Sequence, residues 1–311
     1  MSDTTISNKM ANNPSTTQHK ITFINTIGWA IVGIICIGIL QLILISPLFM
    51  SGYFTWDIFQ LSNAEFHQTL GVSGQAIFKL FECIATILIV AYLVKRDGKS
   101  LSKIGLSIRG FTEHGLIAFA LGTLILLIGF VLLYVTNYID FSINEMSSVP
   151  WIANIGLFTA VAIGEEVFCR GYIQHRLSTV LKPLTAMLIT SGCFAALHYA
   201  NDNLNLVGFL NLFLAGILFG VYYMHTNNLL FPIVLHFAWN FIQGPILGFS
   251  VSGMETSSWL SITASDNPLI TGGAFGFEGS ILCTILTVIA IIKVHHWLKP
   301  RSLTTQSLST K

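Results

Sequence analysis

Long apolar runs alternate along the chain with short polar segments. Eight of these runs approach the roughly 20 residues that a helix needs to cross a hydrocarbon core of about 30 Å. They cover residues 23–46, 75–95, 115–135, 151–173, 183–200, 206–226, 229–248 and 279–297. We expect helices because backbone groups in lipid must pair within their own segment, and because the runs lack the alternation of a barrel strand.

Composition supports a membrane protein. Only 9% of the 311 residues are charged and 53% are hydrophobic, and the mean hydropathy is +0.72. Soluble proteins carry about 25% charged residues, because a globule in water must cover itself with polar groups. The net charge of +1 argues against a nucleic-acid binder. The sequence therefore predicts an all-α, polytopic membrane protein with about eight transmembrane helices and the lipid bilayer as a partner. No feature indicates an oligomeric state.

The charges of the polar segments predict the orientation. Lys and Arg gather after the second, fourth and eighth runs. The alternate segments 51–74, 136–150, 201–205 and 249–278 contain neither, but hold eight Asp and Glu residues. By the positive-inside rule both termini are cytoplasmic, which requires an even number of spans. The first run is too long for a signal peptide and no cleavage site follows it. We expect a multi-pass cell-membrane protein, and the short loops favour a bacterial plasma membrane.

Four regions follow from this pattern. Residues 1–20 form a Ser/Thr/Asn-rich tail that we expect to be disordered and cytoplasmic. Residues 21–149 hold the first three helices, and 150–248 hold helices four to seven, where the polar chemistry gathers. Residues 249–311 supply an outer Gly-rich loop, the eighth helix and a cytoplasmic tail. The five cysteines are scattered through apolar stretches, which is typical of buried side chains. No internal repeat supports an inverted-repeat transporter.

The fourth run contains Glu165, Glu166 and Arg170 within an apolar helix. A charge inside a membrane costs several kcal/mol, so each one needs a reason. Glu166 and Arg170 are four residues apart and can pair on one helix face. Glu165 points about 100° away from Glu166 and lacks that partner. One anchored and one free carboxylate suit a general base. A structural ion pair near the cytoplasmic end, with Glu165 reaching for water, is the alternative.

The fifth and seventh runs add histidines. His198 follows Phe194 by one turn, and His236 shares a helix face with Asn240. A single histidine in a membrane more often makes a packing hydrogen bond. Two histidines, an asparagine and a carboxylate pair on nearby helices instead indicate water activation or metal binding.

Three other patterns have simpler interpretations. Lys79 and Glu82 are three residues apart near the outer end of their helix, which predicts either snorkelling to the membrane surface or a local ion pair. Gly216-x-x-x-Gly220 predicts close helix packing. Gly71-Val72-Ser73-Gly74 is similar to a rhomboid serine motif, but the rest of that site is missing, so we expect a turn before a helix.

Four motifs occur in order on successive runs: Glu165-Glu166-x-x-x-Arg170, Phe194-x-x-x-His198, Phe213-x-x-Gly216-x-x-x-Gly220 and His236-x-x-x-Asn240. Together they resemble the CPBP family, which comprises the CAAX prenyl endopeptidases of type II and the bacteriocin-processing (Abi) intramembrane proteases. The resemblance covers roughly residues 150–245. It implies a membrane endopeptidase that acts on peptides or membrane proteins.

The resemblance also implies roles for the residues. Glu165 would activate water that His198 helps to position. His236 and Asn240 would form the remaining polar wall and supply an oxyanion partner. Glu166 and Arg170 would hold the base in place. The family is usually called a metalloprotease, which makes Glu165, His198 and His236 candidate Zn²⁺ ligands. A glutamate mechanism without metal is also argued for it, and the sequence leaves both open.

Two other functions use similar residues. A non-enzymatic membrane partner, such as a bacteriocin self-immunity or regulatory protein, would use the same fold for binding. A proton-coupled transporter would also need buried Glu and His. One geometric point concerns His198, which would lie about 22 Å deep if its helix entered the bilayer at Pro183. We therefore expect a wet cavity, open toward the cytoplasm, to reach the site.

Overall fold

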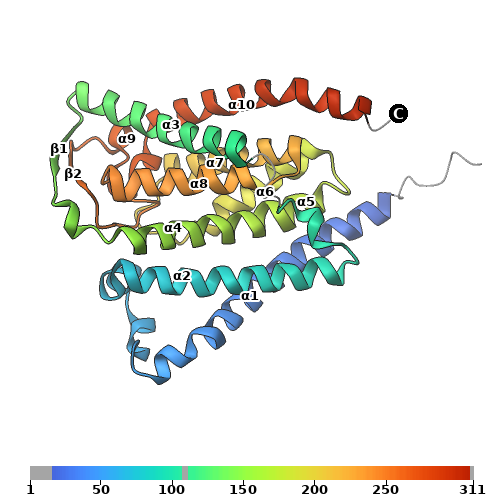
Figure 1. Ribbon diagram of the computed structural model, residues 1–311, viewed down its shortest axis with the longest axis horizontal. Coiled ribbons are helices and arrows are strands. Elements are labelled where there is room, and N and C mark those ends of the chain that lie inside the picture. Colours follow the sequence, from blue (N-terminus) through green and yellow to red (C-terminus); the bar gives the residue numbers. More distant parts are fainter. Residues whose placement is uncertain (1–15, 107–110, 309–311) are drawn as a thin grey trace, which may run out of the picture.

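A computed structural model describes residues 16–106 and 111–308 as a bundle of helices (Figure 1). All eight predicted apolar runs are helical. The main helices are α1 (Thr16–Met50), α2 (Asn63–Arg96), α3 (Leu116–Val135), α4 (Trp151–Glu166), α6 (Pro183–Leu197), α7 (Leu206–Thr226), α8 (Leu230–Phe241) and α10 (Ile281–Leu308). The short helices are α5 (His175–Leu177) and α9 (Pro268–Thr271). Three π-helical segments cover Phe111–Gly115, Val167–Gln174 and Ile242–Ile246. The 3₁₀ turns are Trp56–Gln60, Leu101–Ile104, Met146–Ser148, Gly273–Phe275 and Phe277–Gly279.

The chain is a helical multi-pass membrane protein. Six helices of the described residues are long and apolar enough to cross a membrane: Phe23–Met50, Glu65–Arg96, Thr112–Val135, Trp151–Leu177, Leu206–Thr226 and Ile281–Lys299. Two further apolar helices, Pro183–Leu197 and Leu230–Ile246, are shorter than the predicted runs 183–200 and 229–248. At 1.5 Å per residue α6 is only about 22 Å long, so it stops inside a 30 Å core. His198 therefore lies at a helix end within the bundle.

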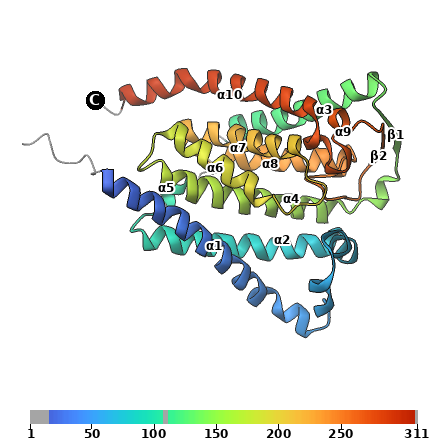
Figure 2. The ribbon, with the colours of Figure 1, turned by 180° about the vertical axis from the view of Figure 1, so that it is seen from behind.

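The helices run roughly parallel, with α1 crossing α2 obliquely and diverging from the rest of the bundle (Figure 1). Both ends of the described chain lie at the same end of the bundle, as the reverse view in Figure 2 also shows. This agrees with the even number of helices that the sequence predicts. The connections α1–α2, α3–α4, α6–α7 and α8–α10 lie at the opposite end, which we call the acidic end because its segments hold the eight acids noted above and neither Lys nor Arg.

The acidic end departs from the all-helical expectation. Strands β1 (Ile139–Ile143) and β2 (Leu260–Ala264) form a two-stranded antiparallel sheet in which Ile139 pairs with Ala264. The chain around β2 then folds back tightly on itself. A Cβ on Gly276, whose φ is 93°, would lie 1.9 Å from the carbonyl oxygen of Ser250. The predicted outer Gly-rich loop is therefore a compact cap in which glycine is required.

Two predicted boundaries are wrong at the start of the chain. Of the tail predicted at 1–20, residues 1–15 lie outside the described residues, and Thr16 begins α1. Helix α2 begins at Asn63 rather than near residue 75, because Ser62 and Glu65 form a capping box. The predicted turn at Gly71 is a kink inside α2, with φ 57° and ψ 179°. Only glycine adopts such a conformation without strain.

The cysteine prediction holds in part. Cys83, Cys169 and Cys283 are buried, while Cys36 and Cys193 are intermediate, and all five are free thiols.

Candidate active site

Glu165 and Glu166 are the last two residues of α4, immediately before the π-helical segment Val167–Gln174. The helix therefore changes its winding at the carboxylate pair. π-Helical turns inside α-helices occur frequently at functional sites. Arg170 lies within this segment and is fully buried, as is Glu166.

Glu166 and Arg170 form the ion pair that the sequence predicts. Arg170 donates from Nη1 to Glu166 Oε1 at 2.8 Å, and from Nη2 to the carbonyl oxygen of Gly216 at 3.0 Å. The guanidinium carbon lies 4.7 Å from the ring centre of Phe194 and 5.2 Å from that of Phe219. A buried charge pair needs such additional contacts to offset its lost hydration. The carboxylate of Glu166 is thereby fixed in place.

Glu166 in turn orients His236 of α8. The Nδ1 atom of His236 lies 3.1 Å from Glu166 Oε1, and the ring stacks on Phe219 at 5.0 Å between centres with 16° between planes. Because a carboxylate accepts, Nδ1 carries the proton and donates it. In the neutral ring the Nε2 atom then holds a free lone pair.

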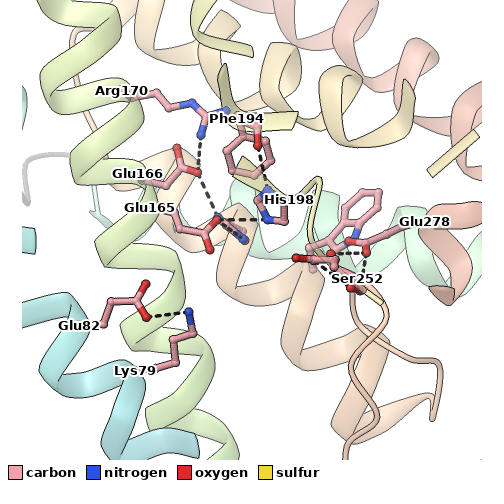
Figure 3. A network of polar contacts seen from close by, with 12 residues as sticks. Lys79, Glu82, Glu165, Glu166, Arg170, Phe194, His198, Ser252 and Glu278 are labelled. Carbon is pink, nitrogen blue, oxygen red and sulfur yellow. Dashed lines mark hydrogen bonds and ion pairs between the residues drawn. The ribbon is translucent and has the colours of Figure 1, made fainter. Parts of the chain in front are cut away.

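His198, directly after α6, is oriented by the backbone. Its Nδ1 donates to the carbonyl oxygen of Phe194 at 2.8 Å, so its Nε2 also holds a lone pair when the ring is neutral. The Nε2 atom lies 3.7 Å from Glu165 Oε2 (Figure 3), and that same oxygen lies 3.9 Å from Nε2 of His236. Three side chains from α4, α6 and α8 therefore converge on one point.

The three converging atoms are all acceptors in this arrangement. Glu165 Oε2 is buried and has no hydrogen-bond partner among the described residues. Three acceptors around one point favour an occupant that donates, such as a water molecule, or a cation. A water held there would have its hydrogens directed at a carboxylate and at imidazole nitrogens.

A cavity of about 480 Å³ gives access to this point. Side chains of Glu165 and His198 remain 27% and 15% exposed within the described residues, whereas that of His236 is 7% exposed. Asn240, one turn after His236, also lines the cavity. The structure thus places Glu165, His198, His236 and Asn240 along one cavity, with Glu166 and Arg170 buried behind them.

The cavity extends toward one end of the bundle. Polar residues of the acidic end line it: Asn63 and His67 at the start of α2, Asn201 and Asp202 after α6, and Ser252 in the cap. The positive-inside rule predicts that this end is not cytoplasmic. The predicted cavity exists, and its lining reaches the acidic end of the bundle. Its predicted opening toward the cytoplasm stays a prediction. The chain after α6 provides part of this lining, because α6 ends at mid-depth.

Lys79 and Glu82 form the predicted ion pair, with 2.8 Å between Nζ and Oε2. Both residues line the same cavity and stand on the α2 side of Glu165 (Figure 3). The sequence placed them near an outer helix end, whereas α2 begins earlier and they lie near its middle.

Glu278 is a cavity residue that the sequence did not single out. It was counted among the outer loop acids, yet it is only 8% exposed. Its Oε1 accepts from Trp239 Nε1 at 3.0 Å, and its Oε2 accepts from Ser252 N at 2.7 Å and Ser252 Oγ at 2.6 Å (Figure 3). The dense glycines before Glu278 were the available signal, because they indicate a tightly folded loop.

The side chains of Glu165, His198 and His236 are of the types that bind zinc, but their atoms are not spaced as zinc ligands are. Ligands that share one tetrahedral zinc ion lie about 3.4 Å apart. The oxygen of Glu165 lies 3.7 and 3.9 Å from the two imidazole nitrogens. Among the described residues no group of three or more His, Cys, Asp or Glu has metal-binding spacing. The chemistry is therefore derived below from the side chains themselves.

Comparison with known proteins agrees with the motif pattern. Residues 147–242 match the family described as type II CAAX prenyl endopeptidase Rce1-like. This confirms the family resemblance for that segment, which contains all six candidate site residues. No match was found among functionally curated proteins or among solved structures.

Proposed function

We propose that this chain, with its Rce1-like domain at residues 147–242, is a membrane endopeptidase of the CAAX-processing type. It hydrolyses peptide bonds of membrane-associated peptides or proteins. The observation that carries the proposal is the convergence of Glu165 Oε2 with Nε2 of His198 and of His236 at 3.7 and 3.9 Å. Convergent acceptors facing a cavity are what activation of a water nucleophile requires.

Glu165 is the general base in this mechanism. A water held between Glu165 and His198 attacks the carbonyl carbon of the substrate and gives one proton to the Glu165 carboxylate. The C–O bond forms as the carbonyl π-electrons move to oxygen. When the tetrahedral intermediate collapses, the C–N bond breaks, and the proton on Glu165 passes to the leaving amine. The carboxylate ends the cycle as it began.

The remaining residues hold this arrangement. Arg170 fixes Glu166, and Glu166 fixes the tautomer and orientation of His236 through Nδ1. Asn240, one helical turn after His236, lines the cavity and supplies an amide donor for the oxyanion. Such fixed dipoles stabilise developing charge without reorganising during the reaction.

The apolar part of the cavity indicates the kind of substrate. Ile34 and Ile37 of α1 line it, as do Leu197 of α6 and Leu212 of α7. An apolar peptide segment would replace lipid contacts there with side-chain contacts. This supports a membrane-associated substrate over a freely soluble one.

The test compares Glu165→Gln and His198→Ala with wild type in reconstituted vesicles and in cells. We expect both variants to insert and fold but to lose cleavage by about 10²-fold or more. Peptide fragments that form with wild type and not with Glu165→Gln identify the substrate. Glu145→Gln, an exposed acid outside the cavity, is the matched control and should retain activity. If the cellular effect survives both site substitutions, the protein is a non-enzymatic membrane partner instead.

A further inference from the structure

Two histidines outside the candidate active site contact each other between α7 and α10. The Nε2 atom of His225 lies 3.1 Å from the Nδ1 atom of His295. His225 belongs to the last turn of α7, and His295 lies four residues before Lys299, where the apolar span of α10 ends. Neither residue lines the cavity of the candidate active site. Both are only partly buried, so the pair can be reached from outside the protein.

The spacing of these two nitrogens matches that of two ligands on one metal ion. Imidazole nitrogens bind Zn²⁺, Ni²⁺ and Cu²⁺ at about 2.0–2.1 Å. Two such nitrogens lie about 3.4 Å apart at a tetrahedral ion and about 2.9 Å apart where they subtend a right angle. The observed separation of 3.1 Å lies between these values. The oxygen of Glu165, in contrast, lies 3.7 and 3.9 Å from the active-site imidazoles.

We propose that His225 and His295 form a binding site for a divalent transition-metal ion such as Zn²⁺, which joins α7 to α10. Among the described residues, no third His, Cys, Asp or Glu stands close enough to make a set of three protein ligands. Water therefore supplies the remaining ligands, which the partial exposure of both histidines allows. The metal site is independent of the proposed peptidase activity.

The two rings can bind a metal ion without losing a proton. A hydrogen bond between two neutral imidazoles requires one nitrogen to donate and the other to accept. The donating ring can carry its proton on its other nitrogen instead, because either ring nitrogen of a neutral imidazole can hold it. Both facing nitrogens then present lone pairs. For a tetrahedral ion these lone pairs tilt by only about 35° from the line between the nitrogens.

The end of α7 also favours a cation beside His225. The helix ends at Thr226, and Asn227 stops it by adopting a left-handed conformation with φ 54°. The last carbonyl groups of a helix carry a partial negative charge, which stabilises a positive charge near them. A metal ion on the last turn of α7 gains from this charge.

The same two helices are already joined at the acidic end. The amide of Asn211 in α7 donates to two backbone carbonyl oxygens directly before α10, at 2.7 and 2.8 Å, and accepts from Thr284 Oγ1 at 2.6 Å. A metal ion on His225 and His295 joins them near the opposite end as well. The family match at residues 147–242 includes α7 but ends before α10. The ion therefore ties α10 to the matched segment.

Titration of the full chain with zinc tests the site. Protein without a polyhistidine tag is stripped of metal in detergent micelles. All variants carry His198→Ala, which removes a candidate zinc ligand of the active site. We expect one zinc ion per chain, and an affinity lowered about tenfold or more by His225→Gln or His295→Gln. Glutamine can keep a hydrogen bond between the helices but does not replace an imidazole ligand. His296→Ala, which changes the exposed neighbour, is the matched control and should bind as before.

Thermal unfolding gives a second measurement. Because a ligand that binds only the folded state stabilises it, zinc should raise the unfolding temperature by several degrees. The two glutamine variants should show little of this rise. Absence of zinc binding, equal affinity in both glutamine variants, or an equal loss in His296→Ala would overturn the proposal. The two histidines would then form a packing hydrogen bond only.

Discussion

Arg170 donates from Nη2 to the carbonyl oxygen of Gly216 at 3.0 Å, which joins the π-helical segment after α4 to the middle of α7. A helical carbonyl already accepts from the following turn, so this contact uses its second lone pair. The hydrogen bond from Arg170 to Gly216 requires the two helical segments to approach closely. The Gly216-x-x-x-Gly220 motif therefore has a second use besides packing, because it presents an acceptor to the arginine that fixes Glu166.

Breaking the buried ion pair between Glu166 and Arg170 should destabilise the folded protein. We expect Arg170→Met and Glu166→Gln each to lower the free energy of unfolding by about 3–5 kcal/mol, because each leaves an unpaired buried group. The double variant should lose clearly less than the sum of the two. Denaturant unfolding in detergent micelles measures this cycle. Additive losses would show that the two side chains do not stabilise one another.

Gly216 should not tolerate a methyl group. An added Cβ would lie 2.9 Å from both Cα and Cβ of Ser191 in α6, so the helices must separate. We expect Gly216→Ala to lower the unfolding free energy by about 1–3 kcal/mol. It should also lower activity, because α6 carries His198.

Gly192→Ala is the matched control for that substitution. A Cβ there has no atom of the described residues within 4 Å, and alanine favours helix over glycine by about 1 kcal/mol. We expect an unchanged or slightly higher unfolding temperature. Equal losses for both variants would contradict the packing explanation.

Glu278 should hold the cap over the cavity. Glu278→Gln replaces one acceptor oxygen by an amide donor, which then faces Trp239 Nε1 or Ser252 N. We expect a loss of about 1–3 kcal/mol and faster amide exchange across residues 247–280. Glu255→Gln, exposed in the same cap, should leave exchange as in wild type. Slow exchange in Glu278→Gln would show that the cap is held by other contacts.

Metal removal should have little effect on cleavage. The spacing of Glu165 from His198 and His236 exceeds that of shared zinc ligands, and Glu165 can accept the proton of water directly. We therefore expect reconstituted protein to retain activity, within about twofold, after dialysis against a strong chelator. Loss of activity that zinc restores, together with one zinc ion more per chain in wild type than in His198→Ala, would assign a metal mechanism.

The sequence determined the membrane class and the helices, and it singled out the six candidate site residues. An apolar run in lipid favours a helix, because its backbone groups must pair within the run. The predicted run 206–226 has the same bounds as α7. Spacing along one helix also indicated two ion pairs. Glu166 lies on the same helix face as Arg170, and Lys79 lies on the same face as Glu82. The motif order further indicated the family that residues 147–242 match.

Tertiary structure decided where α6 ends, which helices contact one another and which loops line the cavity. The early end of α6 places His198 beside Glu165, and apolar composition does not reveal where a short helix stops. The partners of Glu278 lie in α8 and in the cap, 39 and 26 residues away, so no local pattern predicts them. The opening of the cavity depends on which loops meet around it. Such loop packing arises from contacts distant in sequence, and for this reason the sequence predicted a cavity at the site but not the loops that line it.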